Sequence, residues 1–97
     1  MNQVIVTAIL NRSVLRLEYH GSVRLVEPHT YGVNAAGHEA LSCYQVADEG
    51  KPTEAPNWRL MLVAKASAIA MSDATFPRAR ADYVRNAHTW TRIYAQL

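Results

Sequence analysis

Apolar residues near the start of the chain recur at helical spacing. Ile5, Ala8 and Ile9 follow the i, i+3, i+4 pattern that places side chains on one face of a helix. The same run is rich in β-branched residues, which would also suit a buried strand. We predict a short helix over residues 2–11, packed against a sheet.

The period changes to two after this helix. Apolar and charged side chains alternate over residues 13–19, which is typical of a half-buried strand. His20 and Gly21 then provide a two-residue turn, so residues 22–26 are expected to return antiparallel to the first strand. Pro28 has no backbone N–H to donate, and it therefore marks an edge, a bulge or a bend in the second strand.

Three more strands are predicted downstream, separated by segments that contain glycine, proline or polar residues. They cover residues 38–46, 58–63 and 67–71. In the second of these, Trp58, Leu60 and Leu62 are expected on one face. Short strands at close spacing, with turns between them, indicate a small and strongly bent sheet or barrel.

The end of the chain fits two patterns. Trp90, Ile93, Tyr94 and Leu97 stand at i, i+3, i+4 and i+7, which is the apolar stripe of an amphipathic helical turn. Alternate residues from 91 to 97 would suit a closing strand almost as well. In either form, the stripe is expected to cover the open edge of the barrel.

These elements predict a single mainly β (α+β) domain over residues 1–97, with about five strands, a short N-terminal helix and an irregular or helical C-terminal segment. A chain of 97 residues is too short to build two separate cores. Hydrophobic residues make up 49% of the chain and charged residues 19%, which indicates a compact domain rather than a disordered chain. No run approaches the ~20 apolar residues of a membrane span, so no membrane partner is expected.

A single cysteine, Cys43, rules out a disulfide within the chain. It lies in an apolar run, so we expect a buried and inert thiol. One unpaired cysteine is typical of a reducing compartment, and the N-terminus lacks the basic segment of a signal peptide. Both features favour a cytoplasmic location.

The formal net charge of +2 is small, but basic residues gather near the C-terminus. The arginines there are Arg78, Arg80, Arg85 and Arg92. A cationic segment can meet phosphate, because neutralising each phosphate releases counterions. It can equally be a solvated face, and the sequence leaves open whether these arginines form a binding surface.

The sequence contains no recognisable catalytic or metal-binding motif. Four histidines are present, but none has a second histidine or a cysteine at ligand spacing, so we expect no metal and no other cofactor. A nucleophile elbow and a phosphate-cradling glycine loop are also missing, so we expect no enzymatic activity. A minor alternative is a small hydrolase or nuclease that uses His20 or His29 as general base.

The most informative stretch lies between residues 17 and 45. It reads Leu-Glu-Tyr-His-Gly over 17–21, Arg-Leu-Val-Glu-Pro over 24–28, Tyr31-Gly32, Gly37, Leu41 and Tyr44-Gln45. Trp58-Arg59-Leu60, Lys65 and Phe76 continue the pattern. This arrangement resembles the WYL domain family, and in particular its short standalone bacterial members. Of the tripeptide that names the family, the chain keeps Leu41.

The resemblance implies a small Sm-like β-barrel that acts as a non-catalytic regulatory module. Such a module would sense nucleic acid or a nucleotide-like anion in a basic pocket. The residues that match the family's pattern and have suitable chemistry are Tyr19, Arg24, His29, Tyr44, Gln45, Arg59 and Lys65. The partners implied are single-stranded nucleic acid or a nucleotide, and a separate regulatory protein to which the module reports.

Tyr19 and Arg24 are the central pair of this predicted site. They lie on the two arms of the first hairpin, so their side chains can converge on one concave face. The Arg24 guanidinium offers a fork of donors to phosphate, and Tyr19 offers a flat face to a base.

An alternative function is a protein–protein module without a small ligand. In that case the barrel would form a homodimer, or dock on another regulator, through an edge strand and the C-terminal stripe. Salt separates the two functions, because binding through phosphates weakens as salt rises and an apolar interface barely responds.

Overall fold

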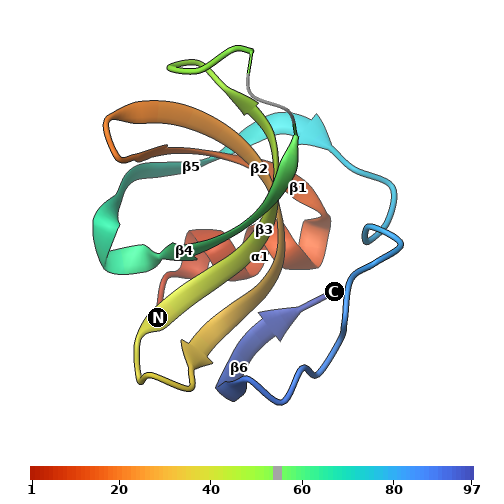
Figure 1. The fold of residues 1–97 in the computed structure, drawn as a ribbon. Coiled ribbons are helices and arrows are strands. Elements are labelled where there is room, and N and C mark those ends of the chain that lie inside the picture. Colours follow the sequence, from red (N-terminus) through yellow and green to blue (C-terminus); the bar gives the residue numbers. More distant parts are fainter. Residues whose placement is uncertain (54–55) are drawn as a thin grey trace.

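The computed structural model describes residues 1–53 and 56–97, and in these residues one helix precedes a six-stranded antiparallel sheet (Figure 1). The elements are α1 (Gln3–Asn11), β1 (Ser13–Tyr19), β2 (Ser22–Asn34), β3 (Glu39–Asp48), β4 (Asn57–Leu62), η1 (Val63–Lys65), β5 (Ala66–Thr75) and β6 (Trp90–Gln96). The prediction of a mainly β domain with a short N-terminal helix is therefore confirmed. Among the described residues, no helix is long and apolar enough to cross a membrane.

Helix α1 forms because its first turn is capped by a side chain. Asn2 Oδ1 accepts hydrogen bonds from the backbone N–H groups of Val4 and Ile5, at 2.9 and 3.2 Å. An asparagine in this position satisfies donors that would otherwise have no partner at a helix start. The helix ends at Arg12, which adopts a left-handed conformation with φ 52°. These local caps favour the helix over a buried strand, which the β-branched residues would also suit.

The first hairpin has the turn that the sequence predicts. His20 and Gly21 both have positive φ, at 50° and 79°, and Tyr19 pairs with Ser22 across them. Two central residues with positive φ give a turn whose twist matches that of the two strands. This turn fixes the register of β1 on β2.

Strand β2 is the centre of the sheet, whose order is β4-β3-β2-β1-β5. Its first half pairs with β1 and its last residues pair with β6, while β3 runs along its other side. The register with β3 slips between Pro28 and Thr30, so Pro28 marks a bulge and not an edge. Residues 27–29 lie between the stretches that pair with β1 and β6, where a missing donor is tolerated.

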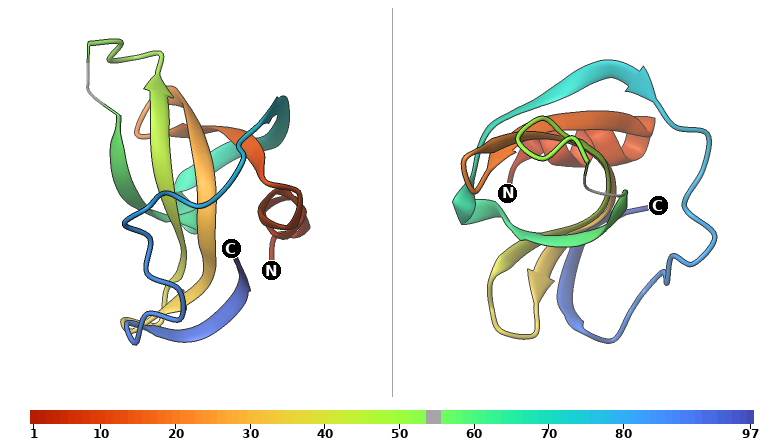
Figure 2. Two further views of the ribbon diagram at one scale, coloured as in Figure 1. Left: turned by 90° about the vertical axis from the view of Figure 1, so that its right-hand side faces the viewer. Right: turned by 45° about the horizontal axis from the view of Figure 1, so that its top comes forward.

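The sheet curls around a core but does not close, because β4 and β5 lie at its two ends (Figure 2). Helix α1 contacts β1, β2, β5 and β6. Its buried face joins inward side chains of the strands to form the core. The members of this core are Ile5, Ala8, Ile9, Leu15, Leu17, Tyr19, Val26, Tyr31, Leu41, Cys43, Met61 and Ala95.

The core face of β4 carries Met61, and not the alternating residues Trp58 and Leu60 that make up its apolar pattern. Met61 is 1% exposed and packs in the core, whereas Leu60 is 58% exposed. Trp58 alternates in phase with Leu60, so it also lies on the outer face of the sheet. The predicted fifth strand is longer than expected and runs from Ala66 to Thr75.

The C-terminal residues form a strand, β6, and not a helical turn. β6 pairs with the end of β2, and Tyr94 and Leu97 pack against the core. A register shift between Val33 and Asn34 interrupts the alternation of β6 close to Trp90. A bulge of this kind re-aims a side chain, and Trp90 lies against the outer face of the sheet.

Residues 76–89 connect β5 to β6 without helix or strand, and we call this segment the strap. In Figure 2 the strap leaves the end of β5, crosses the outer side of the sheet and returns to β6. The sequence gives no period over this segment, and its course depends on contacts with distant strands.

Candidate functional site

One arginine of the strap is anchored on strand β2. Arg80 Nε and Nη2 donate to the two carboxylate oxygens of Glu27, at 2.8 and 3.1 Å. The Arg80 guanidinium also lies 4.1 Å from the centre of the Tyr44 ring. A bidentate pair of this kind fixes both distance and orientation. Glu27 therefore pairs with the strap.

His29 forms a second anchor for the strap. Its Nδ1 donates to the backbone carbonyl of Glu27 at 2.9 Å, and its Nε2 accepts the backbone N–H of Arg80 at 3.0 Å. Its ring is fully buried and lies among those of Trp58, Phe76 and Tyr83. This pattern needs a neutral imidazole with the proton on Nδ1. Both nitrogens are thus engaged within the protein, so His29 holds the strap.

Acid is expected to weaken this anchor. Burial lowers the pKa of His29 below its ordinary value of 6.5, and the charge of Arg80 acts in the same direction. The hydrogen bond to the Glu27 carbonyl and the charges of Glu27 and Asp82 act to raise this pKa but do not outweigh burial. The unfolded chain therefore takes up the proton first as the pH falls. Neutral His29 therefore contributes fully to the free energy of unfolding above pH 6.5. Its contribution declines as the pH falls below this value, until His29 is protonated in the folded protein as well.

Urea unfolding between about pH 8 and pH 5 measures this effect. His29→Gln is the matched variant, because a glutamine carbonyl can accept the Arg80 N–H and does not titrate. We expect the wild type to lose more stability than His29→Gln over this interval. Equal losses in the two proteins would contradict the neutral, buried state of His29.

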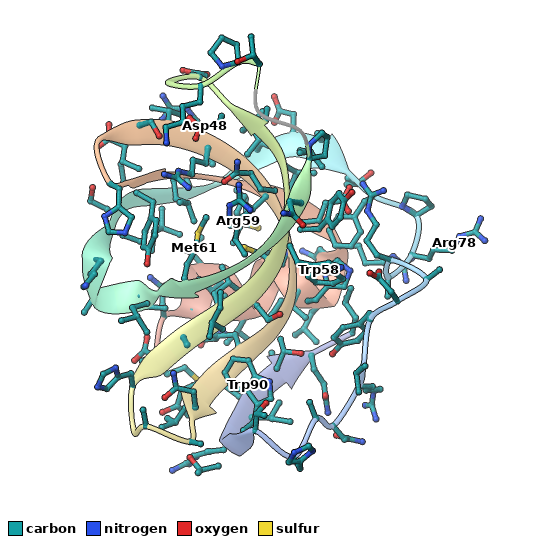
Figure 3. The ribbon with its side chains drawn as sticks, in the orientation of Figure 1. Asp48, Trp58, Arg59, Met61, Arg78 and Trp90 are labelled. Carbon is teal, nitrogen blue, oxygen red and sulfur yellow. The ribbon has the colours of Figure 1, made fainter. Side chains whose placement is uncertain are left out.

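The strap and the outer face of the sheet enclose an open cleft of about 580 Å³, which we call the outer cleft. Strands β2, β3 and β4 form its floor, and the strap and the β2–β3 turn form its rim. Its side chains are mainly apolar, and both tryptophans of the chain, Trp58 and Trp90, line it (Figure 3). A volume of this size lies within the usual range for small-molecule sites.

Hydrogen bonds hold two aromatic side chains of the outer cleft, Trp58 and Tyr83, in place. Asp82 Oδ2 accepts the indole N–H of Trp58 at 2.9 Å. The hydroxyls of Tyr83 and Thr30 are 2.7 Å apart, so a hydrogen bond joins the strap to β2. Leu60 and Val84 remain mostly exposed between these fixed groups. The cleft thus offers flat apolar faces beside a carboxylate.

The central pair of the predicted site, Tyr19 and Arg24, lies inside the curled sheet. Tyr19 is 8% exposed, and its hydroxyl accepts the backbone N–H of Leu62 at 3.1 Å. The Arg24 side chain is 11% exposed, with Nε 3.6 Å from an Asp48 carboxylate oxygen and Nη1 donating to Gln45 Oε1 at 3.2 Å. The two do converge, with the guanidinium 5.4 Å from the Tyr19 ring centre. They do not open onto the concave surface that we expected, because both side chains are mostly buried and Arg24 is held by hydrogen bonds to Ser22 and Gln45 and by the ion pair with Asp48.

Asp48 explains why Arg24 turns inward. Burial acts to raise the pKa of Asp48, but hydrogen bonds from Ser22 and Gly50, the charge of Arg24 and a hydrogen bond from Lys51 together hold it below its usual value. The carboxylate therefore stays charged and keeps Arg24 as its counter-ion.

Three of the other predicted site residues, Gln45, Arg59 and Lys65, lie near this pair. Gln45 accepts a hydrogen bond from Arg24, and the charges of Arg59 and Arg24 both act on the Cys43 thiol. Arg59 pairs across the sheet with the buried Cys43, and Figure 3 shows Arg59 on the opposite side of β4 from Trp58. Lys65 lines a smaller hollow of about 280 Å³ at the first hairpin, together with Tyr19 and Glu18. Tyr44 is on the outer face beneath Arg80. The seven predicted residues therefore form two groups. Five lie on the inner side of the sheet or at the first hairpin, whereas His29 and Tyr44 contact the strap on the outer side.

The four C-terminal arginines are also dispersed. Arg80 is engaged with Glu27, and Arg85 Nε donates to the backbone carbonyl of Leu97 at 2.9 Å. Arg92 lies over the Tyr94 ring at 5.4 Å, while Arg78 points away from the sheet (Figure 3). Their different partners and directions do not support a single cationic surface.

Cys43 is buried as predicted, and burial raises the pKa of its thiol to about 12 in spite of Arg59 and Arg24 nearby. A thiol in this state carries almost no thiolate at neutral pH. Within the described part of the chain, no group of three His, Cys, Asp or Glu side chains is placed to hold a metal ion.

Comparison with known proteins identifies no relative of this chain. No protein-family model, no curated protein and no solved structure matches the chain. The likeness to the WYL family stays a prediction that rests on the residues quoted for it.

The aromatic and acidic residues of the outer cleft that the sequence analysis missed are Trp58, Asp82, Tyr83 and Trp90. Two of them lie in the strap, where no periodic pattern marks a functional segment. Trp90 stands in the apolar stripe and was expected to be structural. The sequence signal for this site was that the chain has two tryptophans, which are 32 residues apart and could meet in the folded protein.

Proposed function

We propose that the protein is a non-catalytic ligand-binding module whose ligand site is the outer cleft. The observation that carries the proposal is the pairing of Trp58 and Trp90 in one open cleft of about 580 Å³. Aromatic side chains held at a concave surface, with a few fixed polar groups, are typical of small-molecule sites. His29 and Cys43, the side chains best suited to catalysis, are engaged or buried.

The ligand that these side chains suit best is a planar heterocycle, such as the base of a nucleoside, a nucleotide or single-stranded nucleic acid. Stacking of a base on an aromatic side chain contributes about 1–3 kcal/mol. Arg24 is already paired with Asp48, so we do not assign phosphate binding to it. The base is therefore expected to supply most of the affinity. This proposal keeps the ligand class that the WYL resemblance implies and moves it to another face of the sheet.

Trp90→Ala tests the site. We expect it to weaken guanosine binding roughly 5- to 150-fold, because it removes one stacking surface worth about 1–3 kcal/mol. Isothermal titration calorimetry measures the dissociation constant. Trp90 is preferred to Trp58 because the Trp58 ring also packs edge-on against His29.

Leu10→Ala is the matched control, because Leu10 is an exposed apolar residue of α1 outside the cleft. It is expected to bind guanosine as the wild type does. Unchanged affinity in Trp90→Ala would contradict the proposal. Binding of oligonucleotides that falls steeply with salt and survives Trp90→Ala would instead indicate a phosphate site elsewhere.

A further inference from the structure

Asp82 gives the outer cleft an acceptor at a fixed position. Its Oδ2 accepts the Trp58 indole N–H, and this bond sets the direction of the carboxylate. An ionised carboxylate offers about four acceptor sites on its two oxygens. The indole uses one of them, and Asp82 lies at the solvent-exposed rim of the cleft. Acceptor capacity therefore remains for a ligand.

The aromatic side chains around Asp82 are held by their own contacts. The Trp58 ring lies 4.7 Å from the His29 ring, edge to face, and 6.3 Å from the Tyr83 ring, nearly parallel to it. Tyr83 is in turn joined to Thr30. A carboxylate attached to such a framework is oriented before the ligand arrives, and less free energy is spent on ordering it.

A carboxylate accepts hydrogen bonds and cannot donate them. It matches a ligand edge with two adjacent N–H donors, which it can bind through both oxygens. Guanine has such an edge, because its ring N–H stands next to its exocyclic amino group. Hypoxanthine keeps the ring N–H but lacks the amino group. In uracil the ring N–H stands between two carbonyl oxygens, which a carboxylate repels.

From this arrangement we infer that the outer cleft selects planar heterocycles that present two adjacent N–H donors, with Asp82 as the residue that recognises them. The inference rests on the proposed ligand-binding function of the cleft and names its ligand class. Guanosine is the simplest probe, and inosine differs from it by the amino group alone.

Calorimetric titration of the wild type and of Asp82→Asn with both nucleosides tests the inference. We expect the wild type to bind guanosine roughly 5- to 150-fold more tightly than inosine, the range of one good bidentate contact. In Asp82→Asn this preference should fall to about twofold or less. The asparagine carbonyl can still accept the Trp58 indole N–H, so the cleft keeps its shape. Asp73→Asn, an exposed change on β5, should keep the preference of the wild type.

The possible failures are distinguishable. Equal affinity of the wild type for the two nucleosides, or a preference that persists in Asp82→Asn, overturns the inference. If Trp90→Ala still weakens binding in that case, the proposed function stands without it. If neither nucleoside binds the wild type, both the inference and the proposed function are overturned.

Discussion

Gly32→Ala is expected to destabilise the protein by about 4 kcal/mol or more, which is a large part of the stability of a small domain. A Cβ atom at residue 32 would stand 2.0 Å from the backbone oxygen of Arg92 and 2.9 Å from Cα of Ile93. Both atoms belong to the backbone of β6, which pairs with β2 at this point. The clash cannot be relieved by a side-chain rotation, so β6 has to leave the sheet.

Urea unfolding and amide hydrogen exchange measure this result. We expect a lower midpoint of unfolding and a loss of exchange protection in β6. Gly21→Ala is the control, because a Cβ there meets no atom within 4 Å. It should cost only the strain of its positive φ, about 1 kcal/mol. A Gly32→Ala protein as stable as Gly21→Ala, with β6 still protected, would contradict the pairing of β6 with β2.

His29→Ala is expected to lower the free energy of unfolding by about 3 kcal/mol. It leaves a cavity among three aromatic rings and removes the acceptor of the Arg80 backbone N–H. A buried donor without a partner adds to the cost of the cavity. Because the strap forms one wall of the outer cleft, this variant should also bind guanosine more weakly.

Chemical denaturation and calorimetric titration of the same preparation test both effects. His38→Ala is the matched control, since His38 is an exposed residue beside the β2–β3 turn. We expect it to differ from the wild type by less than about 0.5 kcal/mol. If His29→Ala keeps both the stability and the guanosine affinity of the wild type, His29 does not anchor the strap.

The parts of the fold that the sequence predicts are those set by local interactions. The cap at Asn2 fixes the start of α1, and the His20-Gly21 turn fixes the register of the first hairpin. The placement of β6 depends on contacts with β2 that are distant in sequence, such as the hydrogen bond from the Thr91 side chain to the carbonyl of Val33, 58 residues away. The spacing of the apolar residues in this segment is compatible with both a helical turn and a strand, so the sequence does not predict which one forms.

The candidate site was harder to predict because its side chains are positioned by distant partners. The sequence suggests that Arg24 is a free cation on a hairpin, but Arg24 pairs with Asp48 on the neighbouring strand β3 and lies inside the sheet. Trp58 faces outward because Met61 takes the core side of β4. Asp82 lies in the strap, which has no periodic pattern and is placed by Arg80 and Tyr83.

The indole resonances of an isotope-labelled sample test the ligand site directly. The chain has two tryptophans, and both line the outer cleft, so their two indole N–H signals report on the cleft without any substitution. Titration with guanosine is predicted to shift both signals along saturable curves that give one dissociation constant. If both indole signals stay in place, either guanosine binds at another site or it does not bind at all. Either result would contradict the assignment of the outer cleft as the ligand site.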